Sequence, residues 1–259
     1  MRRSEKPVIG VLANHLVEDG VHRNWLRWKY IEAAERYAGT EVVIIPTQTM
    51  RASRGFLARL DGIILTGDES NLDPSEFGTK GSERTGPDYL HLERDRYRDR
   101  AANMVLSGAI DLGLPFLAIC RGLQELTVKL GGTLHERLWQ PGASFRHHED
   151  TSLPREHQYD PVHHVDLVPG GVLHRLLGSE RILVNSLHTQ GIATLPPSLT
   201  VEAVASDGLV EAVSVTDAPH FQLAVQWHPE WHIANDQVGQ RIFEAFGEAC
   251  ERIRRQNAA

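Results

Sequence analysis

The 259-residue chain has no long apolar run, few cysteines and no Pro/Gly/Ser-rich linker. No stretch of about 18 apolar residues could form a membrane-spanning helix, and the apolar run 8–13 is too short for a signal-peptide core. The two cysteines, Cys120 and Cys250, are far apart in the chain, so they predict neither a disulfide framework nor a C-x-x-C metal site. We therefore expect a soluble, cytoplasmic protein with no membrane partner.

An excess of basic residues is also absent. The formal net charge is -7, and basic residues are mixed with acidic ones, as in "HLERDRYRDR". No positive surface suited to a phosphate backbone is expected, so nucleic acid is not a predicted partner. With 41% hydrophobic and 24% charged residues, the composition is typical of a folded domain with a sizeable core. We expect one domain over residues 1–259.

Short apolar runs rich in β-branched residues alternate with helical patterns in the first half of the chain. Strands are predicted at 7–13, 41–46, 61–67 and 115–120, and helices at 24–39, at 53–60 and within 88–113. This alternation is typical of βαβ units, and uniformly apolar strands favour burial on both faces of a parallel sheet. The second half predicts strands at 163–168, 181–186, 199–206, 209–215 and 221–227, few helices between them, and a closing helix at 236–255. The predicted fold class is α/β, with a mostly parallel central sheet flanked by helices and an antiparallel portion in the second half.

Cys120 stands where a predicted strand changes into a helical pattern, in "LPFLAICRGLQELTVKLGG". A buried cysteine at a strand end is usually a small packing residue. Here Ala118 and Gly122 flank it two positions away on either side, and small neighbours are what a sharp strand-to-helix turn with an exposed nucleophile requires. Such a turn sets the sulfur at a helix N-terminus, which stabilises the thiolate, and directs the Arg121 N–H toward a developing oxyanion.

A cysteine nucleophile needs a base, and the base needs an orienting partner. The apolar stretch "FQLAVQWHPEW" ends with His228, Pro229 and Glu230. Residues at i and i+2 of an extended segment project to the same side, and proline ends the strand pairing. Taken alone, this tripeptide is most simply a solvated strand end. Together with Cys120 it predicts a Cys-His-Glu triad.

The chain resembles a known family over nearly its whole length. "AICRGLQE" with "VQWHPEW" is similar to the Cys-His-Glu motifs of class I glutamine amidotransferases and of the gamma-glutamyl hydrolases that share their fold, above all the bacterial gamma-glutamyl-gamma-aminobutyrate hydrolases of putrescine and polyamine degradation. Further matching stretches are "PVIGV", "LDGIILTG", "VNSLHTQG" and "SDGLVEAVSV". The resemblance implies a flavodoxin-like sandwich, no cofactor, and hydrolysis of a small gamma-glutamyl amine, gamma-glutamyl-gamma-aminobutyrate in the first place.

The resemblance also implies a role for individual positions. Cys120 is similar to the nucleophile, His228 to the base and Glu230 to its orienter. The oxyanion donors implied are the backbone N–H groups of Gly67, Asp68 and Arg121. The substrate-binding residues implied are Gln124, Asn185, Ser186, His188 and Gln190. Asp68 stands where the family often has glycine or serine, and we expect its side chain to point away from the oxyanion, because a carboxylate there would repel it.

Other features of the sequence predict structural roles. The histidines of "RHHED", His157 and the pair His163-His164 show no recurring ligand spacing, so we expect no metal site, and segment 142–160 is expected to be a solvated loop near the mouth of the active site. Trp25, Trp28 and Tyr30 are expected to pack in the core or against the first helix. The loop before them, "NHLVEDGVHRN", follows a parallel strand and is expected to line the leaving-group side.

Three other functions stay open at this point. The chain could be a glutaminase subunit that passes ammonia to a separate partner, a hydrolase of another gamma-glutamyl amine such as a glutamylated polyamine or folate polyglutamate, or a non-catalytic protein on the same fold. The sequence determines neither the leaving group nor the oligomeric state, so a homo-oligomer also stays open.

Overall fold

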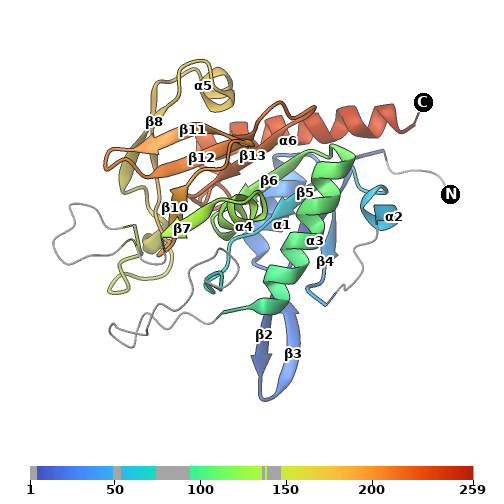
Figure 1. The fold of residues 1–259 in the computed structure, drawn as a ribbon, viewed down its shortest axis with the longest axis horizontal. Helices are drawn as coiled ribbons and strands as arrows, with labels where there is room; N and C mark the ends of the chain where they lie inside the picture. The colour runs from blue at the N-terminus through green and yellow to red at the C-terminus, as the bar shows by residue number, and fades with distance from the viewer. Residues whose placement is uncertain (1–4, 49–53, 74–93, 136–137, 139–146, 259) are drawn as a thin grey trace.

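The computed structural model describes residues 5–48, 54–73, 94–135, 138 and 147–258. Its main feature is a nine-stranded sheet (Figure 1). The parallel half has the order β4 (Glu41–Ile45), β1 (Val8–Leu12), β5 (Gly62–Leu65), β6 (Phe116–Ile119) and β13 (Gln222–Val225). The antiparallel half continues with β12 (Val210–Val215), β11 (Leu199–Ala205), β8 (His163–Leu167) and β9 (Arg181–Val184). The predicted parallel sheet and its antiparallel extension are confirmed.

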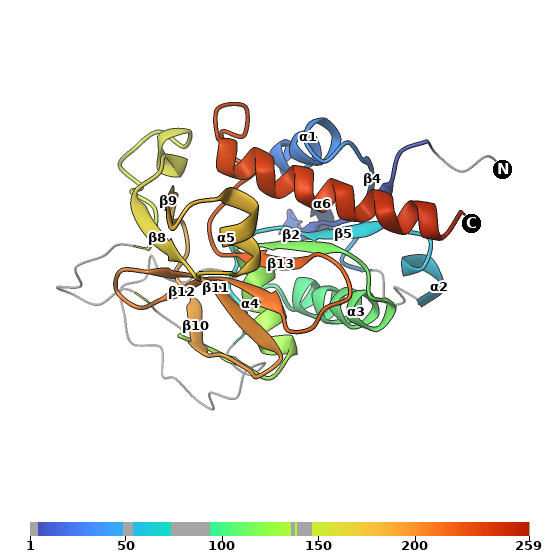
Figure 2. The same ribbon diagram turned by 90° about the horizontal axis from the view of Figure 1, so that it is seen from above.

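Helices cover both faces of the sheet (Figure 2). On one face lie α1 (Trp28–Arg36) and α6 (Gln237–Gln256), and on the other α3 (Arg96–Leu112) and α4 (Arg121–Lys129). The shorter helices are α2 (Arg54–Leu57), α5 (Val172–Leu177) and the 3-10 turn η3 (His157–Tyr159). The sequence did not predict α5. No helix in the described ranges is long and apolar enough to span a membrane.

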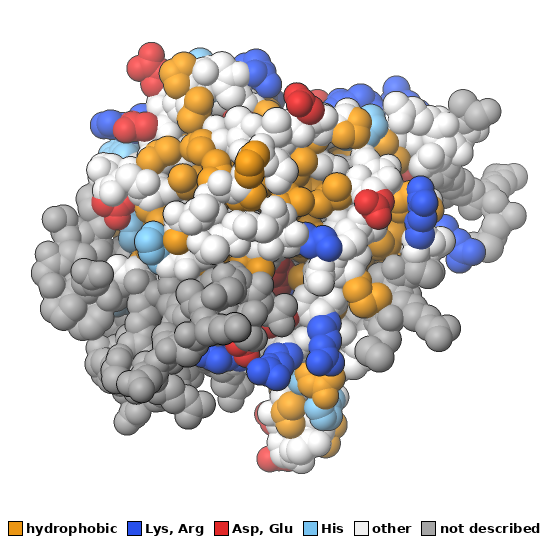
Figure 3. All heavy atoms as spheres, in the orientation of Figure 1, with side chains coloured by type: hydrophobic (Ala, Val, Ile, Leu, Met, Phe, Trp, Pro, Cys, Tyr) orange, Lys and Arg blue, Asp and Glu red, His pale blue; other side chains and the backbone are white. Residues whose placement is uncertain are grey.

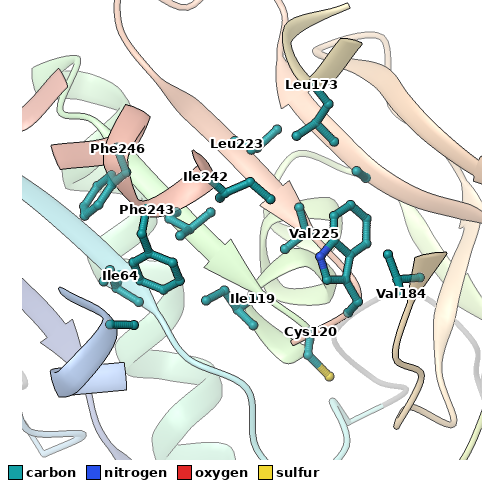
Figure 4. Packing of buried hydrophobic residues seen from close by; sticks show 14 of the residues in the cluster. Ile64, Ile119, Cys120, Leu173, Val184, Leu223, Val225, Ile242, Phe243 and Phe246 are labelled. Carbon is teal, nitrogen blue, oxygen red and sulfur yellow. The ribbon is translucent and has the colours of Figure 1, made fainter. Parts of the chain in front are cut away.

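The sheet divides most of the apolar core into two large clusters because side chains alternate along each strand. Ile64 of β5 and Ile119 of β6 pack toward α6, in the cluster that Figure 4 shows from close by. Ile63 and Leu65 belong to the cluster on the α3 side. All four are fully buried, which confirms the prediction for these central strands. The prediction is wrong for β4, where Ile44 is 49% exposed, because β4 is the edge strand of the sheet.

The stretch predicted as a loop and helix start at 14–25 is instead a β-hairpin. It consists of β2 (Asn14–Glu18) and β3 (Val21–Trp25), paired in antiparallel register, and it projects from the body of the molecule (Figures 1 and 3). Its turn uses Asp19 and Gly20, with φ of 52° and 74°. Two positive φ values suit a tight hairpin turn, for which Asp-Gly is a strong sequence signal. A second small sheet pairs β7 (Thr133–His135) with β10 (Gly191–Thr194).

Candidate active site

Cys120 lies at the turn between β6 and α4 with φ 52° and ψ -102°, a conformation that side-chain-bearing residues rarely adopt. Gly122 makes this turn possible, since a Cβ there would lie 2.7 Å from the carbonyl oxygen of Leu65. The side chain of Cys120 stands at the edge of the apolar cluster, and its sulfur points away from Ile119 and Val225 (Figure 4). The turn therefore has the features of a nucleophile elbow.

His228 reaches the cysteine because β13 and β6 are parallel neighbours. Val225 pairs with Ile119 in the register, and the Cys120 N–H donates to the Val225 carbonyl at 2.8 Å. Three residues beyond β13, His228 Nδ1 lies 2.7 Å from Oε1 of the fully buried Glu230. Burial lowers the pKa of His228, but the Glu230 and Cys120 charges and hydrogen bonds to both raise it well above its ordinary value. The imidazole can therefore hold a proton between the thiol and the carboxylate.

The backbone of His228 is held by Asn185. The side-chain amide of Asn185 donates to the His228 carbonyl at 3.0 Å, and its oxygen accepts the His228 N–H at 2.8 Å. With both amide atoms engaged, Asn185 is placed as a support of the base rather than as a lining residue of the cavity. This two-point contact fixes the backbone position of His228 and so limits the orientations of its imidazole ring.

Gly67 follows β5 and packs against the same imidazole. A Cβ at this position would lie 2.7 Å from His228 Cε1 and 3.2 Å from Cys120 Cβ, so only glycine fits. Its N–H donates to the Tyr30 hydroxyl at 2.8 Å, and that hydroxyl lies 3.5 Å from His228 Nδ1. Burial, first of all, raises the pKa of Tyr30 well above its ordinary value, so the phenol stays neutral. Tyr30, expected as a packing residue, therefore also contacts the catalytic groups.

The N–H groups of Asp68 and Arg121 differ from that of Gly67. Neither donates a hydrogen bond to another residue within the described part of the chain, so both are available to an oxyanion. The Asp68 carboxylate accepts a hydrogen bond from Ser70 and lies 3.8 Å from the Arg121 guanidinium. The Arg121 guanidinium therefore compensates part of the Asp68 charge, although Asp68 itself lies on the wall of the cavity that Cys120 lines.

A buried ion-pair network lies beneath these turns. Arg98 of α3 is fully buried, and its guanidinium makes two hydrogen bonds to Glu125 of α4, at 2.9 and 3.0 Å. It also donates to the carbonyls of Leu12, Ala13 and Thr66 and to the side chains of Asn14 and Thr66. Asn14 in turn donates to the Gly67 carbonyl at 3.0 Å. Arg98 therefore joins the ends of β1 and β5 to α4, which carries the nucleophile at its start.

A cavity of about 140 Å³ opens over the triad and brings some of the expected binding residues together. Cys120, Gln124, His188 and His228 line it. Ser186 and Gln190 do not: the amide of Gln190 accepts the Leu72 N–H and donates to the Leu72 carbonyl. The segment 185–190 thus splits between residues that line the cavity and residues that hold the segment in place.

The mouth of the cavity is charged and aromatic. Arg27 and Arg155 both lie on its wall and both donate to the Glu69 carboxylate. Tyr159 lines the wall as well and stacks on Trp231 with 3.6 Å between ring centroids. Glu149, Arg155 and Tyr159 of the expected loop therefore line the cavity, but His147 and Tyr159 are buried rather than solvated. Residues 142–146 of that loop lie outside the described residues.

Histidines that the sequence did not connect meet in the antiparallel half. His147, His163 and Glu211 hold potential ligand atoms within 4.8 Å of one another. His163 was weighed as a ligand from sequence, but its partner Glu211 was not, because nothing in "LVEAVSV" distinguishes this glutamate from a surface residue. His157 and His164 are exposed and lie apart from this group.

Comparisons with known proteins show the family of the chain. The chain is 41% identical to gamma-glutamyl-gamma-aminobutyrate hydrolase PuuD of Escherichia coli strain K12, over 95% of this chain and 94% of that protein. It is 32% identical to a putative glutamine amidotransferase of Mycobacterium tuberculosis, over 95% and 76% of the two chains. Among solved structures, a putative GMP synthase subunit from Thermoplasma acidophilum matches with a TM-score of 0.65 at 19% identity, covering 99% of this chain and 100% of that one, which shows the shared fold. The model of the peptidase C26 family matches residues 7–230, and the chain therefore belongs to the peptidase C26 family.

Proposed function

We propose that the protein is a cysteine-dependent hydrolase of gamma-glutamyl amides, and that its substrate is gamma-glutamyl-gamma-aminobutyrate, cleaved to glutamate and gamma-aminobutyrate in putrescine and polyamine degradation. The observation that carries this proposal is the strained Cys120 turn beside the His228–Glu230 pair, at the carboxyl ends of two adjacent parallel strands. The 41% identity to the Escherichia coli enzyme supports the choice of substrate. Two free, buried cysteines are consistent with a cytoplasmic enzyme.

In the first step the Cys120 thiolate attacks the side-chain carbonyl carbon of the glutamyl group. The N–H groups of Arg121 and Asp68 stabilise the oxyanion, because neither is used elsewhere among the described residues. Gly67 is not assigned as an oxyanion donor, because its N–H already donates to the Tyr30 hydroxyl. Its role is to let the backbone approach the imidazole closely. His228 transfers its proton to the departing amine nitrogen, and a glutamyl thioester remains.

In the second step water replaces the amine. His228, now neutral, removes a proton from the water as it attacks the thioester carbonyl, and the thiolate of Cys120 leaves. Glu230, hydrogen-bonded to Nδ1, stabilises the imidazolium that forms again. Glutamate is released with the enzyme in its starting state. Acyl transfer of this kind uses no cofactor.

The residues of the cavity wall are suited to bind a glutamyl group and an anionic leaving group. Gln124 lies on the cavity wall one helical turn after Cys120 and offers a polar contact to the glutamyl half, whereas both ring nitrogens of His188 face other groups of the protein. Arg27 and Arg155 lie at the mouth, where their guanidinium groups suit the terminal carboxylate of a gamma-aminobutyrate leaving group. Asn185, Ser186 and Gln190 hold segment 185–190 in place.

The covalent step has a direct test in Cys120→Ala. Turnover of gamma-glutamyl-gamma-aminobutyrate is expected to fall by at least about 10⁴-fold, because the nucleophile is gone, while the urea unfolding midpoint stays near the wild-type value. In the wild type, acid-quenched intact mass spectrometry should detect one added glutamyl group. Cys250→Ala is the matched control and should form the same adduct. Glutamate release by Cys120→Ala at the wild-type rate would rule out the covalent mechanism.

The substrate has a separate test in steady-state kinetics with gamma-glutamyl-gamma-aminobutyrate, a gamma-glutamyl polyamine and glutamine. We expect kcat/KM for gamma-glutamyl-gamma-aminobutyrate to exceed that for glutamine by at least about tenfold, or about 1.4 kcal/mol of additional transition-state binding. Arg155→Gln should reduce this ratio, and the exposed Arg100→Gln should not. Equal efficiency with glutamine would instead favour a glutaminase subunit.

A further inference from the structure

Four buried side chains from four separate segments meet in the antiparallel half of the molecule. They are His147, His163 at the start of β8, His188 of segment 185–190, and Glu211 of β12. Each histidine is 4% exposed and Glu211 is fully buried. A carboxylate removed from water in this way needs compensation by charge or by hydrogen bonds.

The surroundings of Glu211 do not provide ordinary hydrogen bonds. Its Oε1 lies 3.4 Å from His147 Nδ1, 3.5 Å from His188 Nε2 and 3.9 Å from His163 Nε2. These separations exceed the usual N–H···O range of about 2.7–3.2 Å, and no residue in the described ranges donates a hydrogen bond to either oxygen. They fit ligands around one ion better, because bonds of about 2.0–2.2 Å in a tetrahedron separate neighbouring ligand atoms by about 3.3–3.5 Å.

The outer ring nitrogens have the partners that metal-binding histidines usually have. His147 Nε2 lies 2.8 Å from Oδ2 of Asp207, and His188 Nδ1 lies 3.0 Å from the carbonyl oxygen of Gln190. Both partners are acceptors, so in the neutral imidazoles these nitrogens carry the protons and the lone pairs of the opposite nitrogens face Glu211. The Ser186 hydroxyl, which lies 3.3 and 3.2 Å from those two nitrogens, donates to the His147 carbonyl.

We propose that His147, His163, His188 and Glu211 form a binding site for a divalent transition-metal ion, with Zn²⁺ as the ion that best suits three imidazoles and one carboxylate. Glu211 as a ligand and Asp207 behind His147 together balance the two positive charges of the ion, with all three imidazoles neutral. A second cavity, of about 410 Å³, is lined by His147 and Asp207 and so reaches one edge of this group.

Such an ion would hold segment 185–190 against β8 and β12. That segment carries His188 on the wall of the active-site cavity and Asn185 on the backbone of His228. The metal is therefore a positioning element for the catalytic base and the substrate, outside the reacting atoms, and it goes beyond the hydrolysis proposed above.

The test measures metal binding directly, with tag-free full-length protein. Because the Cys120 thiol and His228 can also bind zinc, every measurement uses a Cys120→Ala background. The chelator-dialysed protein is titrated with Zn²⁺ against a chromophoric chelator, with Co²⁺ to record visible absorption, and with Mg²⁺, which prefers oxygen ligands. The variants are His163→Ala, Glu211→Gln and Asp207→Asn, and the control is the exposed neighbour His164→Ala.

We expect one equivalent of Zn²⁺, the intense visible bands of tetrahedral Co²⁺, and no competing Mg²⁺ binding. His163→Ala and Glu211→Gln should lose this binding, Asp207→Asn should weaken it by about 10–100-fold, and His164→Ala should keep it. Failure of the Cys120→Ala protein to take up Zn²⁺, or equal affinity in Glu211→Gln and His164→Ala, would overturn the proposal. If a ligand variant does not fold, the Zn²⁺ stoichiometry and the Co²⁺ spectrum decide alone.

Discussion

The two halves of the central sheet bury their charges in different ways. Under the parallel half, Arg98 is fully buried and donates to a carboxylate, three backbone carbonyls and two polar side chains. In the antiparallel half, Glu211 is equally buried but faces three imidazole nitrogens at 3.4–3.9 Å, without a hydrogen bond from any residue in the described ranges. Both charges lie near the active site.

This difference separates a buried charge with direct hydrogen-bond partners from a buried charge that faces three imidazoles, where we propose the metal site. The buried Arg98 guanidinium, with all its donors used, makes a rigid support, and its loss leaves Glu125 with Arg121 as its remaining ionic partner. The buried Glu211 carboxylate faces imidazole nitrogens, and either protonation of His147, whose pKa is raised, against the effect of burial, by Glu211 and Asp207, or a bound cation can compensate its charge. The Arg98 network should therefore contribute the same stability with and without added metal, whereas the stability of the antiparallel half should respond to it.

The largest expected effect is on the triad of the parallel half. His228→Ala should lower kcat by about 10⁶-fold and Glu230→Gln by about 10⁴-fold, because an orienting group contributes less than the base. Both losses should be the same with and without Zn²⁺. Steady-state kinetics of gamma-glutamyl-gamma-aminobutyrate hydrolysis measures both variants. Equal losses, or a reversed order, would mean that the roles are wrongly assigned.

The same pair makes a prediction about pH. The pKa of His228 is raised in the folded protein, so the stability that its protonated form contributes is fully present below the unfolded value of about 6.5 and is lost as pH rises through the folded value. Glu230→Gln removes the charge that most raises this pKa. NMR titration of the imidazole should show a lower pKa in the variant, and urea unfolding should show the largest loss of stability at low pH. An unchanged pKa would contradict the pairing.

The next largest effect is expected from a substitution in the buried ion-pair network of Arg98, under the catalytic turns. Arg98→Met should lower the free energy of unfolding by about 3–5 kcal/mol, because Glu125 keeps only Arg121 as an ionic partner and the buried acceptors that Arg98 bonded lose their donor. The exposed Arg100→Met on the same helix should change it by no more than about 0.5 kcal/mol. Urea unfolding with and without Zn²⁺ should give the same cost for Arg98→Met. A cost that disappears with Zn²⁺ would show that the two halves are not independent.

The smallest expected effect comes from Tyr30→Phe, which removes one acceptor. It leaves the buried Gly67 N–H without its partner, at a cost of about 1–3 kcal/mol in stability. It should also lower kcat more than it changes KM, because Gly67 touches the imidazole rather than the substrate cavity. Tyr37→Phe, at the end of the same helix and half-buried, is the control for both measurements. An unchanged kcat would leave Tyr30 with a packing role only.

Some parts of the fold and the site could be predicted from sequence because they depend on neighbours in the chain. Apolar runs predicted the parallel strands, and small residues around Cys120 predicted the turn. The hairpin also had a local signal, the Asp19-Gly20 dipeptide, but the stretch was predicted as a loop and the start of a helix. The elbow and the His228–Glu230 pair are short-range features, and the parallel strand order then brings them together.

The sequence by itself determined the α/β class, the nucleophile with its base and the resemblance to a hydrolase family, since each depends on residue types at short spacing. Only the tertiary structure decided that Arg98, one of several similar residues in "HLERDRYRDR", is the buried one, and that Tyr30 meets Gly67. It also decided that His147, His163, His188 and Glu211 share one site. The physical reason is that burial and charge compensation depend on segments far apart in the chain, and sequence spacing carries no record of which of them meet.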